Sequence, residues 1–475
     1  MQPSLLTLNR GEIEYRKVFL YILAFELMIL AVMLTGDTFL MAGLGAVVLL
    51  PLILLFLPKE PVIGIPLMLV ATGLDFFGTI TEQSDIFTFT YFHIVMVLTF
   101  LSVIMNQLLR REIEIPSVTL WPPVILFLII MSVSLLYTPL FMEGFMEFAR
   151  LCVLLLLTFT MIVCVDTLKR IKFVVWCYIL VPALVAIYTV YEILTQGAFF
   201  ASQVSRVAVE LGIPVYRSTG TFHNPNQLGC FLMIGVTIGF GMLLMKGLNW
   251  MVRLILIASI SITVIGIVAS FSRTAWLSTG FAVLFIILLH RRWSYFFIFT
   301  AIVAIVLLIL SIKFPHILLS TFDRFATILN PFSEESSLSR IALMRSGIRI
   351  WMDHPIFGVG VGSYPFYMPQ YIDPDMPAIL LWVVDPHTLQ IKILAEEGII
   401  GFTIATWFFF TVVVDSIRSL KTMRNEYLRH IQVGFIALFI GFIVNFIFAS
   451  DILNNIFWIT VGIIYAILHV GKQEN

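Results

Sequence analysis

The sequence contains few charged residues. Asp, Glu, Lys and Arg make up 12% of the 475 residues, whereas 60% are hydrophobic and the mean hydropathy is +1.03. Soluble domains carry roughly 25% charged residues, so this composition excludes a single soluble core. Cysteine is also scarce. Cys152, Cys164, Cys177 and Cys230 lie in or beside apolar runs without metal-ligand spacing, and we interpret them as packing or lipid-facing residues.

Long apolar runs fill most of the chain. A transmembrane helix needs ~20 apolar residues to cross ~30 Å of hydrocarbon. Runs of this kind occur at 18–35, 38–57, 61–80, 89–107, 120–138, 145–165, 173–194, 227–246, 252–270, 274–290, 294–313, 389–414, 431–449 and 452–470. Two pairs of runs are separated by very short segments. The sequence therefore predicts an all-α polytopic membrane protein with about 12–14 transmembrane helices, forming a single integral membrane domain over residues 1–475.

The distribution of basic residues predicts the orientation. If the N-terminus is cytoplasmic, most Lys and Arg residues fall on the cytoplasmic side and the short outer loops carry none. The first apolar run lacks a small-residue cleavage pattern, so we expect it to remain as a membrane anchor. Both termini are then cytoplasmic. The two long hydrophilic segments, 195–226 and 314–388, become outer loops.

The first long loop ends at the predicted mouth of a helix. Asn224 followed by Pro225 is typical of a helix N-cap and first helical residue, and Asn226 follows directly. Free backbone N–H groups at such a mouth favour an anion, and Arg217 precedes it in the chain. The alternative is an ordinary turn in which Gly220 and Asn224 only lead the chain into the helix.

Arg273 begins another predicted helix, after a tight turn at residues 270–272. An arginine at the end of a span commonly reaches the lipid headgroups. On the outer face, however, its planar guanidinium is also suited to bidentate contacts with phosphate. Both interpretations remain open from the sequence.

The second long loop contains a predicted amphipathic helix at 339–353. One face carries the apolar stripe Ile341, Met344, Ile348, Trp351 and Met352. Arg340 and Arg345 flank this stripe, and Arg349 lies one turn after Arg345. The helix is expected to lie flat on the outer membrane surface, with its arginines contacting either lipid phosphates or a substrate anion.

Three glycines, Gly358, Gly360 and Gly362, follow this helix and predict a flexible loop that another backbone can approach closely. The context of a nucleotide-binding glycine loop is missing. Asp373 and Asp375 could pair on a divalent metal, but an ordinary proline-containing loop is the preferred interpretation. No metal site and no cofactor are predicted.

His387 is the strongest candidate for chemistry. Asp385 and Pro386 predict a helix start, with Asp385 as the N-cap and Pro386 as the first helical residue. This would put His387 in the first turn, where the helix dipole favours a neutral ring. An interfacial polar residue is the alternative. Glu396 and Glu397 lie about 14–15 Å further along the helix at 1.5 Å per residue, so we expect them to hold neighbouring helices together.

Together, these segments resemble the O-antigen ligase and O-antigen polymerase superfamily of bacterial envelope-glycan enzymes. The similarity covers residues 215–405 and consists of four segments in order. They are Gly220–Asn226, Ser272–Leu277, the arginine helix with 354–360, and His387 with Glu396, Gly398 and Gly401. Thr388 departs from the pattern, in which asparagine commonly follows the histidine.

The resemblance implies a membrane glycosyltransferase of C-type (GT-C) architecture. Its donor would be a glycan on polyprenyl pyrophosphate, and a glycan or a lipid would be the acceptor. Transfer would be metal-independent and inverting, at the outer face of the bacterial cytoplasmic membrane. His387 would serve the acceptor hydroxyl, and Arg273 with Arg340 or Arg345 would bind the pyrophosphate. Arg217, Asn224, Asn226, Gly358, Gly360 and Glu396 would support the site.

A transporter or flippase of lipid-linked glycan is the main alternative. It would also have many spans and basic outer loops. It should also place ionisable residues opposite one another near the middle of the bilayer, and few candidates exist: Glu26, Asp75, His93 and Arg150. A sensor or scaffold is a third class, although no additional domain is visible. The lipid bilayer is an expected partner, and nucleic acid is not.

Overall fold

The computed structural model describes most of the chain after residue 57. The described residues are 21, 24, 57, 59–74, 90–110, 118–195, 217–291, 293–313, 321–322, 335–372 and 385–474. Within these ranges the chain forms helices and no β-strand. The helices are η2 (Pro61–Ile63), α3 (Gly64–Gly73), α4 (Tyr91–Arg110), α5 (Trp121–Ser134), α6 (Phe141–Cys164), α7 (Leu168–Thr195), α8 (Pro225–Leu243), α9 (Trp250–Ala269), α10 (Arg273–His290), α11 (Ser294–Lys313), α13 (Glu335–Asp353), α14 (Tyr364–Tyr371), α15 (Leu389–Thr422), α16 (Glu426–Asn445) and α17 (Asn455–Gln473).

The helices confirm the prediction of a polytopic all-α membrane protein. Nine described helices are long and apolar enough to cross a membrane, and three more are shorter apolar helices. These twelve correspond to the predicted runs from 61–80 to 452–470. The predicted runs 18–35 and 38–57 lie outside the described residues, apart from residues 21, 24 and 57.

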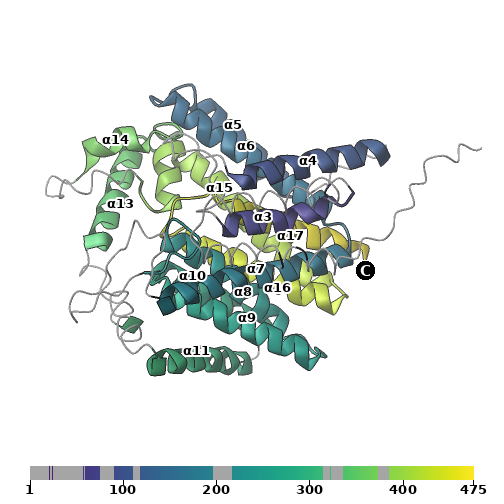
Figure 1. Cartoon of the computed structure of the whole chain (residues 1–475). Helices are drawn as coiled ribbons and strands as arrows, with labels where there is room; N and C mark the ends of the chain where they lie inside the picture. The colour runs from purple at the N-terminus through teal and green to yellow at the C-terminus, as the bar shows by residue number, and fades with distance from the viewer. Residues whose placement is uncertain are drawn as a thin grey trace, which may run out of the picture.

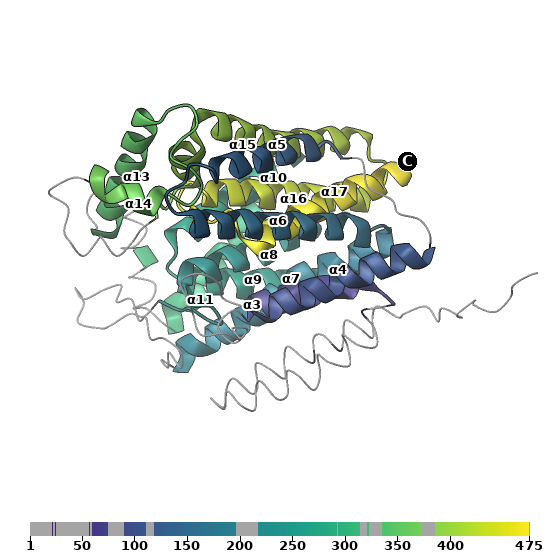
Figure 2. The same ribbon diagram turned by 90° about the horizontal axis from the view of Figure 1, so that it is seen from above.

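The apolar helices lie side by side as a bundle (Figures 1 and 2). Helix α16 packs against α8, α10 and α17, so it lies near the centre of the core. Glycines permit the closest approach. A Cβ at Gly241 of α8 would lie 3.1 Å from the Cα of Gly434 in α16. Small residues of this kind let membrane helices pack tightly.

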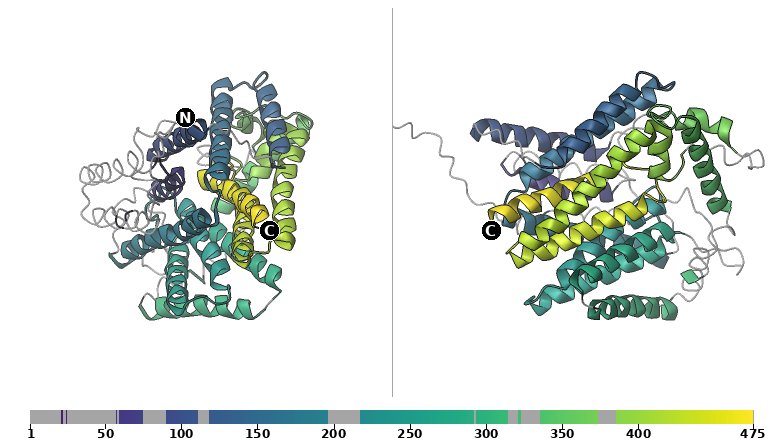
Figure 3. Two further views of the ribbon diagram at one scale, coloured as in Figure 1. Left: turned by 90° about the vertical axis from the view of Figure 1, so that its right-hand side faces the viewer. Right: turned by 180° about the vertical axis from the view of Figure 1, so that it is seen from behind.

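One end of the bundle carries the candidate site. Helices α13 and α14 lie at this end, and the C-terminus lies at the opposite end (Figures 1 and 3). The turns 270–272 and 446–454 and the segment 385–388 belong to the same end, which we call the loop end. Helix α13 runs across the loop end, nearly perpendicular to the spans (Figure 1).

The face of α13 that packs against protein lies opposite the predicted apolar stripe, which stays accessible as expected for a helix on the membrane surface. Met352 is 65% exposed, and the other four residues of the stripe are half-buried. The opposite face is buried instead, through Ser339, Ala342, Leu343, Ser346, Gly347 and Ile350. Its small residues allow a close approach, because a Cβ at Gly347 would lie 2.4 Å from Ile391 of α15. Packing against protein therefore selected a face that hydrophobicity alone did not indicate.

Candidate active site

His387 lies in a tight turn before α15, and not in the first helical turn. The helix begins at Leu389 with Thr388 as its N-cap, so the predicted start at Pro386 is wrong. The Asp385 carboxylate accepts a hydrogen bond from the backbone N–H of His387 at 2.7 Å. His387 has φ 51°, in the left-handed region. The Asp385 carboxylate thus stabilises a local turn in competition with the helix.

The turn after α16 holds this segment in place. The backbone N–H of Leu389 donates to the Phe446 carbonyl at 3.0 Å, and the Thr388 hydroxyl donates to the Ile447 carbonyl at 3.1 Å. The Ser450 hydroxyl donates to the Asp385 carboxylate. Thr388, where the family pattern has asparagine, therefore has a structural role here. These bonds fix the backbone on both sides of His387.

The surroundings of His387 favour its neutral form. Its side chain is half-buried, and burial lowers the pKa of the ring below its usual value. Asp385 raises this pKa, whereas Arg340 lowers it. No hydrogen bond within the described residues occupies either ring nitrogen. A neutral imidazole with an available nitrogen can accept a proton from a hydroxyl.

Arg340 is the arginine of α13 that interacts electrostatically with His387. It is half-buried, whereas Arg345 and Arg349 are exposed on the same helix. The guanidinium of Arg349 donates to the Tyr371 carbonyl at 2.9 Å. Of the predicted arginines of α13, Arg340 is therefore the one whose charge acts on His387.

The glycine loop packs against the first part of α15. The N–H groups of Val359 and Gly360 donate to the carbonyls of Ala395 and Glu396 at 2.9 and 2.8 Å. Gly358 and Gly360 have φ 67° and 98°, which side-chain-bearing residues rarely adopt. The predicted close approach is confirmed. The backbone that approaches is that of α15.

Glu396 anchors this loop, as its expected structural role requires. Its Oε1 accepts a hydrogen bond from the Tyr364 N–H at 3.0 Å, and the side chain is fully buried. One turn earlier, the Lys392 ammonium pairs with the Glu147 carboxylate of α6 at 2.7 Å. Helix α15 then kinks at Gly398, which has φ 66°. Its first turns are thereby held to α6 and α14.

A second group of contacts surrounds Arg273. Asn224 caps α8 as predicted, accepting from the Asn226 N–H at 2.8 Å. Asn226 Oδ1 in turn accepts hydrogen bonds from the Arg217 guanidinium at 3.1 Å and the Ser272 hydroxyl at 2.8 Å. Ser272 caps α10, whose first residue is the half-buried Arg273.

Arg217 strengthens the link between these segments. Its Nε donates to the Ser270 carbonyl at 3.1 Å. The network therefore joins the start of α8 to the turn before α10 and fixes the backbone that carries Arg273. Helix α10 packs on α16, and the turn after α16 holds the His387 segment. Both groups thus belong to the loop end.

Several residues at this end were not predicted as part of the site. Ser450 has no sequence signal beyond its place in a short polar turn. The ion pair between Glu147 and Lys392 could have been suspected, because each is a charged residue inside an apolar run. Pairing them requires knowledge of which helices are neighbours.

Residues 258–406 match the family model described as O-antigen ligase. The match supports the predicted O-antigen ligase and polymerase superfamily. The matched range contains Arg273, Arg340, Arg345, Gly358, Gly360, His387 and Glu396, and it begins after Arg217, Asn224 and Asn226. No curated protein matches the chain.

Proposed function

We propose that this protein transfers a glycan from polyprenyl pyrophosphate to a hydroxyl group of a glycan or lipid acceptor. The family match supports a membrane glycosyltransferase of the O-antigen ligase or polymerase type. The observation that carries the finer proposal is His387 itself. It is a half-buried histidine on a rigid turn, with a lowered pKa and Arg340 nearby.

His387 would act on the acceptor. The acceptor oxygen attacks the anomeric carbon of the donor sugar, a new carbon–oxygen bond forms, and the bond to pyrophosphate breaks. His387 takes the proton that the hydroxyl loses and later passes it to solvent. A single displacement of this kind inverts the anomeric configuration.

Arginines would stabilise the leaving group. Negative charge accumulates on the lipid pyrophosphate as its bond to the sugar breaks, and preorganised guanidinium groups stabilise such charge. Arg340 is the first candidate because of its interaction with His387. Arg273, fixed by the Ser272 cap, is the second, and the exposed Arg345 is the third.

The reaction would take place at the outer face of the cytoplasmic membrane, with both termini in the cytoplasm. The predominance of Lys and Arg on the opposite side of the bundle supports this orientation. Polyprenyl-linked glycans would then reach the loop end after translocation. Loops 195–226 and 314–388 would lie outside the cell or in the periplasm.

A transporter remains the competing class. Of the four ionisable residues named for it, Glu26 and Asp75 lie outside the described residues. His93 and Arg150 do line one cavity. His93, however, is the third residue of α4, so it lies near a helix end and not at mid-bilayer. Arg150 lies deeper, about 14 Å from the start of α6 at 1.5 Å per residue. A transporter would need a second ionisable residue opposite it at that depth, and His93 does not supply one.

Deletion of the gene followed by electrophoresis of envelope glycans tests the proposal. A ligase deletion should leave the glycan unattached to its acceptor, whereas a polymerase deletion should abolish the ladder of chain lengths. Complementation with wild type should restore the pattern, and complementation with Arg340→Ala should not. A normal glycan pattern in the deletion strain would contradict the proposal.

A further inference from the structure

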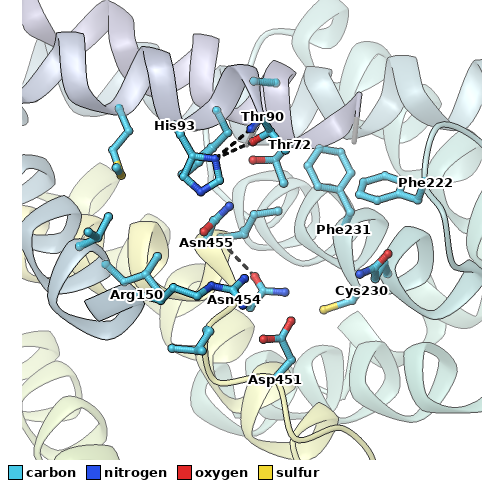
Figure 4. A pocket seen from close by; sticks show the side chains of 18 of the residues that line it. Thr72, Thr90, His93, Arg150, Phe222, Cys230, Phe231, Asp451, Asn454 and Asn455 are labelled. Carbon is cyan, nitrogen blue, oxygen red and sulfur yellow. Dashed lines mark hydrogen bonds between the residues drawn. The ribbon is translucent and has the colours of Figure 1, made fainter. Parts of the chain in front are cut away.

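A cavity of about 520 Å³ lies between α3, α4, α6, α8, the end of α16 and the start of α17. Ligand pockets typically span roughly 300–1,000 Å³, so a small molecule or one end of a larger one would fit. Polar side chains from α4, α6 and the turn before α17 point toward the same space (Figure 4). Asp451 of the 446–454 turn lines the cavity, so this part of the cavity lies at the loop end.

Arg150 is the most informative residue of the lining. It is the tenth residue of α6, about 14 Å from the helix start at 1.5 Å per residue, and its flanking residues are apolar. No hydrogen bond or ion pair to its guanidinium occurs within the described part of the chain. The side chain is exposed and lines the cavity, and an ionised arginine inside a span that faces such a cavity usually marks a functional site. A ligand with acceptor oxygens would satisfy it.

Two further polar residues line the cavity. His93 lines the cavity, and its Nδ1 accepts a hydrogen bond from the Thr90 N–H at 3.2 Å. Asn454 caps α17 through its Oδ1, which accepts from the N–H groups of Ile456 and Phe457 at 3.0 and 3.2 Å. Its amide NH₂ group is therefore the part that can contact a ligand.

Asp451 supplies an acceptor to the same space. It projects toward the cavity in Figure 4, close to Asn454 and on the side toward which Arg150 points. Asp451 and Arg150 interact electrostatically across this space. The lining thus contains one guanidinium and one carboxyl group.

This mixture of charges discriminates between ligands. A pyrophosphate carries at least two negative charges and would be repelled by Asp451. A sugar hydroxyl can donate to a carboxylate and accept from a guanidinium at once. The largely buried rings of Phe222 and Phe231, with centroids 5.3 Å apart, form part of the apolar wall of the cavity.

We propose that this cavity binds a sugar unit of the acceptor glycan, with Arg150 and Asp451 as its main polar contacts. The inference rests on the proposed glycosyl transfer. The 446–454 turn connects the two sites, because it lines the cavity through Asp451 and holds the His387 segment through Ser450. Asp451 also interacts electrostatically with Asp385, two residues before His387.

The test uses the full-length protein in lipid nanodiscs. The acceptor probe is a set of glycans of one to three repeat units, released by mild acid from the surface polysaccharide of the source bacterium. Polyprenyl-pyrophosphate glycan extracted from the same cells is the donor. Binding of the acceptor probe is measured directly by thermophoresis, and KM is measured for each substrate separately.

Arg150→Gln and Asp451→Asn should each weaken binding of the acceptor probe about tenfold, as expected for loss of one charged hydrogen bond. The KM of the acceptor should rise by a similar factor, while kcat and the KM of the donor should change little. Glu143→Gln, at the exposed start of α6, and Arg253→Gln, in the first turn of α9, are matched controls. Both should bind the acceptor probe like wild type.

Other outcomes overturn the assignment. Unchanged acceptor binding in both variants would exclude this cavity as the acceptor site. A rise confined to the KM of the donor would show that the cavity binds the lipid pyrophosphate instead. Arg150→Lys is the control for misfolding. It keeps the charge, so it should retain more binding of the acceptor probe than Arg150→Gln. Saturable binding without any transfer by wild type would refute the proposed function and leave the glycan site standing.

Discussion

Replacement of His387 tests both the chemistry and the turn that carries it. General-base catalysis contributes about 10²–10⁴-fold, which corresponds to ~3–5 kcal/mol of transition-state stabilisation. We expect His387→Ala to lose this factor in kcat. Alanine, however, is also strained at φ 51°. Asparagine tolerates the left-handed region better, so His387→Asn should preserve the turn and lose the base.

The pH dependence provides an independent check. The neutral ring is the active form, and burial together with Arg340 lowers its pKa. Activity should therefore persist as pH falls through the usual range of histidine and decline below it. Arg340→Gln removes a charge that lowers this pKa, so the acid limb should move to higher pH. Asp385→Asn removes the charge that raises it and should move the limb to lower pH, while an oxygen remains to accept the His387 N–H.

Single-turnover transfer with purified protein and extracted donor measures these effects. The amount of donor bound, determined by filter binding, should be similar in wild type and His387→Asn. If His387→Asn transferred glycan at more than about a tenth of the wild-type rate, the general-base role would be refuted. An acid limb that failed to shift in opposite directions in Arg340→Gln and Asp385→Asn would show that another group controls it.

Three further predictions concern other parts of the loop end. Arg273→Ala should reduce transfer about a hundredfold, and Arg273→Lys should not restore it, because an ammonium cannot form the same bidentate contact; transfer rates at equal membrane abundance decide this. Gly398→Ala should lower the thermal unfolding midpoint, measured in detergent, because its Cβ would lie 2.3 Å from the Ile356 carbonyl oxygen at φ 66°; an unchanged midpoint would contradict the packing argument. Ser202→Cys and Ser336→Cys, in a cysteine-free background, should both react with an impermeant thiol reagent in intact cells or spheroplasts, and protection of both would reverse the proposed topology.

Most of the described spans could be predicted from the sequence. A run of about twenty apolar residues is a strong signal, because the bilayer requires that length and backbone groups in lipid must be hydrogen-bonded within the helix. Helix starts were predicted equally well where the cap is local. Asn224 before Pro225 and Ser272 before Arg273 each cap a helix through their own side chains.

Local patterns failed where a distant contact decides the conformation. Asp385 and Pro386 have the pattern of a helix start, yet Asp385 also accepts a hydrogen bond from Ser450, 65 residues away in the chain. The helix then begins three residues later than Pro386. The face of α13 that packs on protein could not be read from the pattern for a similar reason. Its buried face includes Ser346 and Gly347, which a hydrophobicity pattern does not identify as core residues.

The 446–454 turn shows why the site could not be assembled from the sequence. It is a short connection between two spans, and its polar residues could be expected merely to face water. In the structure, Ser450 bonds to the carboxylate that shapes the His387 turn, and the neighbouring Asp451 faces the cavity with Arg150. Adjacent residues thus serve the proposed catalytic base and the proposed glycan site. A displacement of this turn would alter both sites together, which would couple occupancy of the cavity to the position of His387.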